Sequence, residues 1–379
     1  MAKELPIKLV LPQLNLQDSE AVKEAVTQNW VTGGGPFVTD FEVNLKKALD
    51  TNREVVALNS GTAALHLALI LAGVKAGDYV ICQTMSFVAT SNPIAYLNAI
   101  PVFVDSEPET YNMSVPALKE AVQFCITHNK KPAAIIAVHS FGIPCKIQEI
   151  ATLAREYNIP LVEDAAEALG SKVADCACGT FGDFGVLSFN GNKLITTGGG
   201  GALICKDVEQ SRKARHLASQ AKSSSTGFEH DSIGYNYVMP GLNAALGVSQ
   251  LKTLQDKISA KRNLHHFYNQ IFEDIEGVEL LSAPEAYVSN NWLNVIRFTS
   301  ESDTYSASKL LKHLEELGIE SRFPWKPLHL QGIYKEQSYF GATIAENLWK
   351  NGLCLPSGCG LTKSEQIEIQ NALIAYFSA

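Results

Sequence analysis

The chain has 379 residues, 46% of them hydrophobic, and its 31 basic and 39 acidic side chains give a formal net charge of −8. This length exceeds one small domain, so we expect a core large enough to enclose a cofactor. The acidic balance, with no block of like charge, indicates that nucleic acid is not a partner.

No segment is suited to a membrane or to secretion. The longest apolar run, at residues 63–73, contains His66 and is shorter than the roughly 18 to 20 residues that span a bilayer. Lys3, Glu4 and Pro6 stand where a signal peptide would be apolar. We therefore expect no membrane partner and a cytoplasmic protein.

The eight cysteines are dispersed, and only Cys176 and Cys178 lie close together. One C-x-C pair supplies only half of a tetrahedral zinc site, and no second pair has zinc spacing. We predict no metal site, and we expect most of the thiols to be reduced and buried.

From residue 54 onward, short β-rich runs alternate with amphipathic, helix-like stretches. Continuous apolar strands separated by helices indicate an α/β fold with a largely parallel sheet covered on both faces. The ligands of such sheets bind beyond the carboxyl ends of the strands. The predicted strands are EVVAL (54–58), DYVICQ (78–83), PVFVD (101–105), AAIIAV (133–138), PLVEDA (160–165), GVLSF (185–189) and GALIC (201–205).

After residue 207 the pattern becomes helical, with a long periodic stretch at residues 241–272 and a final helix near 364–377. The region between them reads as α+β. On the usual domain sizes we predict a large cofactor-binding α/β domain at 1–250 and a smaller C-terminal α+β domain at 251–379.

Lys193 follows a short apolar strand and precedes four consecutive glycines, in the stretch LSFNGNKLITTGGGG. This position puts an amine at the end of a strand, where burial favours the neutral form that attacks carbonyl groups. The pattern indicates Schiff-base chemistry, whereas the same lysine standing alone would read as a solvated loop residue. Glycines 198–201 lack the spacing of a nucleotide-binding loop and predict a tight turn.

Two other segments also reach strand ends. Gly61 and Thr62 open a helix, and their N–H groups would bind an anion such as phosphate, although an ordinary helix cap explains the same residues. Asp164 ends an apolar strand, where a buried carboxylate needs a cation, such as a protonated pyridine nitrogen. A simple helix cap is again the alternative.

Phe87 and Ser188 complete the set. The ring of Phe87 could stack on a flat cofactor, and the hydroxyl of Ser188 could bind phosphate, although each residue alone suits a core or a turn. A phosphate site, a stacking aromatic ring, a carboxylate and a Schiff-base lysine in one chain match the requirements of pyridoxal 5′-phosphate (PLP).

With these motifs the chain resembles the DegT/DnrJ-type nucleotide-sugar aminotransferases, a branch of the aspartate aminotransferase-like PLP enzymes of fold type I. The resemblance covers nearly the whole chain and implies a large domain with a mostly parallel mixed sheet. It is carried by NWVTGGGPFVTDFE (29–42), LNSGTAALHLAL (58–69), VEDAAEALGS (162–171), GTFGDFGVLSFNGNKLITTGGGG (179–201), IGYNYVMPGLNAALGVSQL (233–251), SRFPWKPLHLQ (321–331) and LCLPSG (353–358).

The resemblance assigns roles to individual positions. Lys193 matches the lysine that bonds to PLP, and Asp164 matches the carboxylate on the pyridine nitrogen. Asn236 matches a phosphate ligand from the neighbouring subunit, which implies a homodimer with shared active sites. The other matched cofactor-binding positions are Gly61, Thr62, Phe87, Glu167 and Ser188, and the positions matched to sugar-nucleotide binding are Asn29, Trp30, Val31, Thr32, Arg322, Trp325, Lys326 and His329.

Two positions depart from the common pattern. Many relatives have Gln at the position of Glu167, and a carboxylate beside the cofactor's phenolic oxygen disfavours the ionised phenolate unless the carboxyl is protonated or turned away. Gly199 replaces the usual acidic residue of the glycine run. This replacement matches the acetamido-sugar branch of the family, and we expect it to open space near Lys193.

The resemblance implies transfer of an amino group from L-glutamate, with release of 2-oxoglutarate, to the C4 ketone of a nucleotide-linked 4-keto-6-deoxy sugar. A UDP-linked 2-acetamido-2,6-dideoxy sugar of the bacillosamine or legionaminic acid type is the predicted substrate, and a GDP- or dTDP-linked sugar of the perosamine type is the alternative. A PLP-dependent sugar dehydratase is disfavoured because it would have histidine in place of Lys193. A non-catalytic PLP-fold protein would not need the complete set of residues, and a nicotinamide dehydrogenase would need a dinucleotide fingerprint that is absent.

Overall fold

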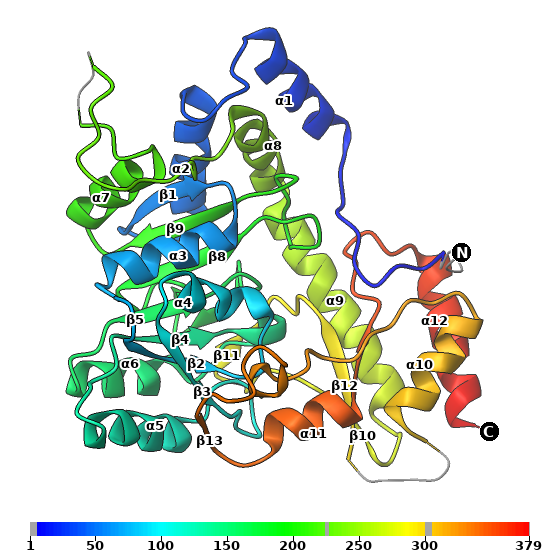
Figure 1. Ribbon diagram of the computed structural model, residues 1–379. Coiled ribbons are helices and arrows are strands. Elements are labelled where there is room, and N and C mark those ends of the chain that lie inside the picture. The colour runs from blue at the N-terminus through cyan, green and yellow to red at the C-terminus, as the bar shows by residue number, and fades with distance from the viewer. Residues whose placement is uncertain (1–5, 224–226, 300–304, 379) are drawn as a thin grey trace.

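The computed structural model describes residues 6–223, 227–299 and 305–378, and these form a layered α/β unit with a smaller α+β part beside it (Figure 1). The signal-peptide argument rests partly on Lys3 and Glu4, which lie outside the described residues. Within the described ranges, no helix combines the length and the apolar character needed to cross a membrane.

The large part is built on an eight-stranded sheet. Only β9 among its described strands runs antiparallel to its neighbours, and every pairing from β8 to β13 is parallel. The prediction of a mostly parallel mixed sheet is therefore confirmed. In spatial order the strands are β1 (Glu54–Leu58), β9 (Gly201–Cys205), β8 (Phe184–Ser188), β5 (Leu161–Asp164), β4 (Ala134–Val138), β2 (Tyr79–Gln83), β3 (Ile100–Val104) and β13 (Tyr339–Phe340).

Helices cover both faces of this sheet because successive strand residues point to opposite sides. In β1, Val56 and Leu58 pack with Leu65 on one face, whereas Val55 and Ala57 join a separate core on the other. One face carries α3 (Gly61–Leu71), α4 (Asn92–Tyr96) and α7 (Val208–Ala218). The other face carries α2 (Pro36–Ala48), α5 (Val115–Thr127), α6 (Ile147–Glu156) and α8 (Gly241–Lys252), with α1 (Leu16–Thr27) against α8.

The smaller part is reached through α9, which follows α8 after a break at Thr253. Its antiparallel sheet has the order β10–β12–β14, and Ile7 near the N-terminus joins its core. The domain boundary at residue 250 falls inside α8 and stays a prediction. The elements are α9 (Leu254–Phe272), β10 (Val278–Leu280), β12 (Asn294–Phe298), α10 (Ala307–Glu316), α11 (Ile344–Asn351), β14 (Gly352–Leu355) and α12 (Lys363–Phe377).

Short elements connect the two parts. A small third sheet joins β11 (Tyr287–Val288) to β6 (Lys172–Val173) and β7 (Cys176–Ala177). Three single turns of 3₁₀ helix lie at η1 (Val88–Thr90), η2 (Ser140–Gly142) and η3 (Leu328–Leu330). The first two of these turns follow strands β2 and β4, so they lie at the edge where ligands of parallel sheets bind.

Candidate active site

A cavity of about 430 Å³ lies at the carboxyl ends of the parallel strands, between the large sheet and loops of the smaller part. A more open hollow of about 570 Å³ lies between α1 and α8, away from the strand ends. We take the first cavity as the candidate site because titratable groups converge there. The predicted site residues in its lining are Gly61, Thr62, Phe87, Asp164, Glu167, Ser188, Lys193, Arg322 and Trp325.

Lys193 lies on the turn that follows β8, where its N–H donates to the carbonyl of Asn190 at 3.0 Å. Its side chain is only 14% exposed, and Nζ lies 3.3 Å from Oε1 of Glu167. On another side, Nζ lies 4.3 Å from the centroid of the Trp292 ring. The amine is therefore held inside the cavity rather than solvated on a loop.

Asp164 ends β5 and is 5% exposed. Its Oδ2 accepts a 2.7 Å hydrogen bond from the Thr90 hydroxyl, and Oδ1 accepts one from the N–H of Ala166 at 3.2 Å. Burial raises the pKa of this carboxyl, although these hydrogen bonds and the charge of Lys193 act in the opposite direction. A buried carboxylate with remaining lone pairs suits a cationic partner in the cavity.

The N-terminus of α3 opens into the cavity, which Ser60, Gly61 and Thr62 line. The hydroxyl of Ser60 caps the N–H of Ala63 at 3.0 Å, and the first N–H groups of the helix have no intrahelical acceptor. A Cβ on Gly61 would lie 3.0 Å from Cβ of Ser188, so a side chain at this position would occupy the space beside that hydroxyl. The positive end of the helix dipole favours an anion such as phosphate here.

Phe87 precedes η1 and is 55% exposed, although it is a large apolar side chain. It lines the same cavity as Asp164 and Lys193. An exposed ring at the mouth of a cavity offers a face on which a flat heterocycle can stack.

Glu167 lies on the turn after β5 and is almost completely buried. Its Oε1 faces Lys193, and its Oε2 accepts a 2.9 Å hydrogen bond from the N–H of Phe141. Burial raises the pKa of the Glu167 carboxyl, against the effects of the Lys193 charge and the Phe141 hydrogen bond. Both carboxyl oxygens are thus engaged by groups of this chain.

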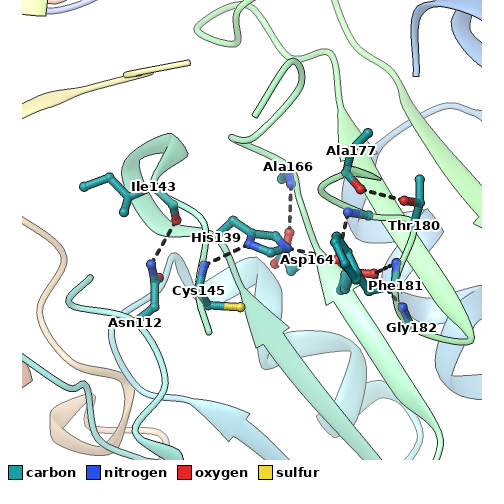
Figure 2. Close-up of polar contacts among 12 residues, drawn as sticks. Asn112, His139, Ile143, Cys145, Asp164, Ala166, Ala177, Thr180, Phe181 and Gly182 are labelled. Atoms are coloured by element: carbon teal, nitrogen blue, oxygen red, sulfur yellow. Dashed lines mark hydrogen bonds and ion pairs between the residues drawn. The ribbon is translucent and has the colours of Figure 1, made fainter. Parts of the chain in front are cut away.

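A buried polar network supports the strand that carries Asp164. Figure 2 shows His139 between Cys145 and that strand. The N–H of Cys145 donates to Nδ1 of His139, and Nε2 of His139 lies 3.1 Å from the carboxylate of Glu163. Glu163 also accepts hydrogen bonds from the N–H groups of Gly179, Phe181 and Gly182. These contacts fix β5 directly before Asp164.

Several predicted residues lie outside the cavity lining. Asn236 is exposed, and its carbonyl accepts a hydrogen bond from Asn59. Asn29, Trp30, Val31 and Thr32 are also exposed, between α1 and α2. Lys326 extends over the ring of Trp349. Their predicted contacts with cofactor or sugar nucleotide stay predictions.

His329 is also outside the lining and is held by its own neighbours. Its Nδ1 lies 2.7 Å from the Thr84 hydroxyl, its Nε2 lies 3.5 Å from Glu346, and its ring stacks on Tyr339. Burial lowers the pKa of His329, although the contact with Glu346 acts in the opposite direction. Its predicted substrate contact likewise stays a prediction.

Sequence reasoning missed Thr90 and Trp292. Thr90 belongs to η1, three residues after Phe87, and its role is visible only when η1 meets the end of β5. Trp292 precedes β12 in the smaller part, about a hundred residues from Lys193, and no local motif points to it. Only the folded chain brings these residues to the site.

PLP is the group that these residues fit. The anion site at Gly61 and Ser188, the buried carboxylate of Asp164 and the enclosed amine of Lys193 correspond to the phosphate, the pyridine nitrogen and the carbonyl of that cofactor. Within the described ranges, no group of three or more His, Cys, Asp or Glu side chains is arranged to hold a metal ion.

Comparison with known proteins identifies the family of the chain. The model of the DegT/DnrJ/EryC1/StrS aminotransferase family matches residues 12–374, and the chain belongs to this family. It is 39% identical to EpsN of Bacillus subtilis, with 98% of this chain and 96% of the relative covered. It is 34% identical to the GDP-perosamine synthase of Escherichia coli O157:H7, with 98% and 99% covered.

A solved structure gives the same result. The crystal structure of a DegT DnrJ EryC1 StrS aminotransferase from Brucella abortus has a TM-score of 0.89 and 30% identity, and the match covers 96% of each chain. The expected fold type I, PLP as cofactor and aminotransferase activity on nucleotide-linked keto sugars are therefore confirmed at the level of the family.

Proposed function

We propose that the enzyme transfers the amino group of L-glutamate to the C4 ketone of a UDP-linked 2-acetamido-2,6-dideoxy-4-keto hexose. The observation that carries the choice of sugar is Gly199, which lines the cavity with Lys193. A Cβ built on Gly199 would meet no atom within 4 Å among the described residues other than its two chain neighbours. This open space suits a substituent as large as an acetamido group, whereas an acidic side chain at residue 199 would fill it.

The residues on the large-sheet side would hold the cofactor. When bound, PLP supplies the carbonyl carbon that accepts the amino group from glutamate and the electron sink for the transfer. Asp164 would keep the pyridine nitrogen protonated, and the N-terminus of α3 with Ser188 would bind the phosphate. Phe87 would present the face of its ring to the heterocycle.

Lys193 would move the proton at C4 of the sugar. Its Nζ is enclosed in the cavity and reaches that proton without diffusing, because the side chain is tethered to the turn after β8. A positioned amine of this kind accelerates proton transfer through proximity and general acid–base catalysis.

The opposite wall would bind the sugar nucleotide. Arg322 lies at the cavity with its guanidinium on the Glu320 carboxylate, and the Arg322 side chain is 70% exposed. A diphosphate would offer this guanidinium a second, more strongly charged acceptor. The further predicted contacts are the exposed Lys326 and residues 29–32, and the mostly buried His329.

A homodimer with shared active sites is part of the proposal. Asn236 is exposed and outside the cavity of its own chain, as a ligand of the partner's cofactor would be. Phe228 and Ile233, on the same segment, are 92% and 85% exposed. A subunit interface over this segment would cover both apolar side chains. Sedimentation of the PLP-loaded protein tests the dimer.

The experiment that tests the sugar is an amination assay across UDP-, GDP- and dTDP-linked 4-keto-6-deoxy sugars with L-glutamate as donor. We expect the UDP-linked 2-acetamido sugar to give the highest kcat/KM, and Gly199→Glu to reduce its amination far more than that of sugars without a 2-acetamido group. A preference for the GDP-linked sugar would instead support the perosamine-type reaction, which the 34% identity to a GDP-perosamine synthase favours. In that case the proposal for the sugar is wrong.

A further inference from the structure

Lys193 lies between two groups that suit a positively charged amine. The carboxylate of Glu167 is 3.3 Å from Nζ on one side, and the ring centroid of Trp292 is 4.3 Å away on another. Aromatic faces attract cations within about 6 Å of the ring centroid, most strongly when the ring is an indole. Glu167 and Trp292 come from different parts of the molecule and together form what we call the lysine seat.

The indole face of this seat is held rigidly. Nε1 of Trp292 donates to the carbonyl of Asn192 at 2.8 Å, and the backbone N–H of Trp292 donates to Oδ1 of Asn290 at 2.9 Å. The carbonyl of Trp292 accepts a hydrogen bond from the buried amine of Lys261 at 2.7 Å. The indole also stacks on Trp325, with an angle of 8° between the rings. These contacts fix the orientation of the face toward Lys193.

The carboxylate side of the seat belongs to the same framework. Nδ2 of Asn290 donates to the carbonyl of Glu167 at 2.8 Å, so one side chain connects Glu167 with Trp292. The N–H of Phe141 holds the Glu167 carboxylate, and the ring of Phe141 stacks on Trp325 at 4.8 Å. The distance between carboxylate and indole is therefore set by long-range contacts and not by Lys193 itself.

We propose that Trp292 is a positioning residue that holds Lys193 while its amine is not bonded to the cofactor. This inference rests on the proposed function in taking Lys193 as the residue that bonds to PLP. In that bond, Nζ forms C=N with the carbonyl carbon, and the carbonyl oxygen leaves as water. The bonded nitrogen would keep at most one of the three hydrogens of an ammonium and would be tied to the cofactor's carbon, so the seat, which binds a free ammonium with a carboxylate and a ring face, favours the unbonded amine.

The lysine seat shifts the equilibrium between free and PLP-bonded Lys193, because a contact that is made in only one of two states stabilises that state. Lys193 is free in the cofactor-free protein and in the complex with pyridoxamine phosphate, which has no carbonyl. It is bonded only in the complex with PLP. Removing the indole face should therefore tighten the binding of PLP and leave that of pyridoxamine phosphate unchanged.

The test is a pair of equilibrium titrations on cofactor-free Trp292→Leu and unaltered protein, one with PLP and one with pyridoxamine phosphate. We expect the dissociation constant for PLP to fall about fivefold in the variant, the size expected from a partly desolvated cation–π contact, while that for pyridoxamine phosphate stays the same. Trp292→Phe keeps a ring face and should show a smaller change.

Trp349→Leu is the matched control, because that indole lies beside Lys326 and not Lys193. It should leave the ratio of the two dissociation constants unchanged. If Trp292→Leu does not fold, unaltered protein made with fluorinated tryptophans replaces it. The ratio of the dissociation constant for PLP to that for pyridoxamine phosphate should then fall with each added fluorine, and this change should disappear in Trp292→Phe.

A ratio that does not change, or two dissociation constants that change in parallel, would overturn the inference and leave Trp292 with a packing role. No sugar and no turnover enter these titrations. Failure of the proposed function would appear separately, as the absence of amination across the panel of sugars.

Discussion

The two walls of the cavity are built in different ways. The wall from the large sheet uses residues at or just beyond strand ends. Near neighbours fix part of their backbone, because the N–H of Ala63 donates to the Ser60 hydroxyl and the N–H of Ala166 donates to the Asp164 carboxylate. The wall from the smaller part depends on distant contacts. Trp292 bonds to Asn192, 100 residues away in sequence.

This difference indicates a division of work. Motifs of a few residues, repeated at the ends of parallel strands, are sufficient to shape a cofactor site. The opposite wall has to be brought to that site by the packing of the smaller part, and Asn290 and Lys261 supply the connections. Substitutions in the first wall should therefore affect chemistry directly, whereas those in the second should act through position and stability.

Replacing Lys193 by alanine is the strongest test of the first wall. We expect turnover to fall by about a thousandfold or more, because the variant lacks the amine that we propose both bonds to PLP and carries the proton. Noncovalent cofactor binding should remain, since the phosphate and pyridine contacts are intact. Steady-state amination and cofactor titration measure the two effects. Lys193→Arg keeps the charge and should be equally inactive, and a near-normal rate in either variant would contradict the assignment.

Asp164→Asn should lower kcat by about a hundredfold, because the amide cannot carry the negative charge that we propose keeps the pyridine nitrogen protonated. Asp105 is a matched control. It is also buried at the end of a strand, but it accepts hydrogen bonds from the N–H groups of Ala342, Ile344 and Ala345, away from the cavity. Asp105→Asn should reduce the melting temperature and leave kcat unchanged. Equal losses of kcat in both variants would show that Asp164 acts through the fold alone.

The two walls of the cavity also differ in how much of each could be predicted from the sequence. The runs of residues that form β1 and β9 were predicted with the boundaries that the structure has, and Asp164 and Lys193 were placed at strand ends. Strand-end positions can be predicted because alternation of apolar runs and helices encodes a parallel sheet locally. The long helical stretch at 241–272 was also predicted, and the structure divides it at Thr253.

The opposite wall could be predicted only in part: the family resemblance pointed to Arg322 and Trp325, which line the cavity, but not to Trp292. Trp292 stands before a strand of the smaller part, where an apolar aromatic residue normally indicates core. Its role depends on the ring orientation set by Asn290 and Lys261, and a hydrogen bond between distant loops leaves no periodic signal in the chain. His329, for which a motif predicts a substrate contact, packs on Tyr339 and Thr84 in this structure, and that contact stays a prediction.

Lys261→Met tests the contribution to stability of the buried amine that donates to the carbonyl of Trp292 in the second wall. Burial lowers the pKa of Lys261 to about 8, from 10.5. Below pH 8 the amine of Lys261 is protonated in both the folded and the unfolded protein, so burying its charge lowers the stability of the fold by the full amount. Between pH 8 and 10.5 only the unfolded state keeps the proton, so this residue's contribution to stability rises with pH, by up to about 3 kcal/mol.

Urea unfolding of Lys261→Met and unaltered protein at pH 7.5 and pH 10.5 measures this rise. The unaltered protein should gain stability relative to the variant as the pH increases, because methionine cannot titrate. The exposed Lys252→Met of α8 gives the baseline for the loss of a positive charge. A stability difference that stays constant with pH would mean that Lys261 keeps an ordinary proton affinity in the folded protein.

Thr90→Val is expected to have the smallest effect of these substitutions, and it tests how Asp164 is positioned for the reaction. It removes the 2.7 Å hydrogen bond to Oδ2 of Asp164 while keeping the volume of the side chain. A hydrogen bond to a charged group contributes about 1.5 to 3 kcal/mol, so we expect kcat/KM to fall about tenfold or somewhat more. Thr90→Ser keeps the hydroxyl and should restore most of the rate. If Thr90→Val keeps a normal rate and Thr90→Ser loses it, the methyl group rather than the hydroxyl of Thr90 positions Asp164. The carboxylate is then held by the Ala166 N–H and the packing of β5.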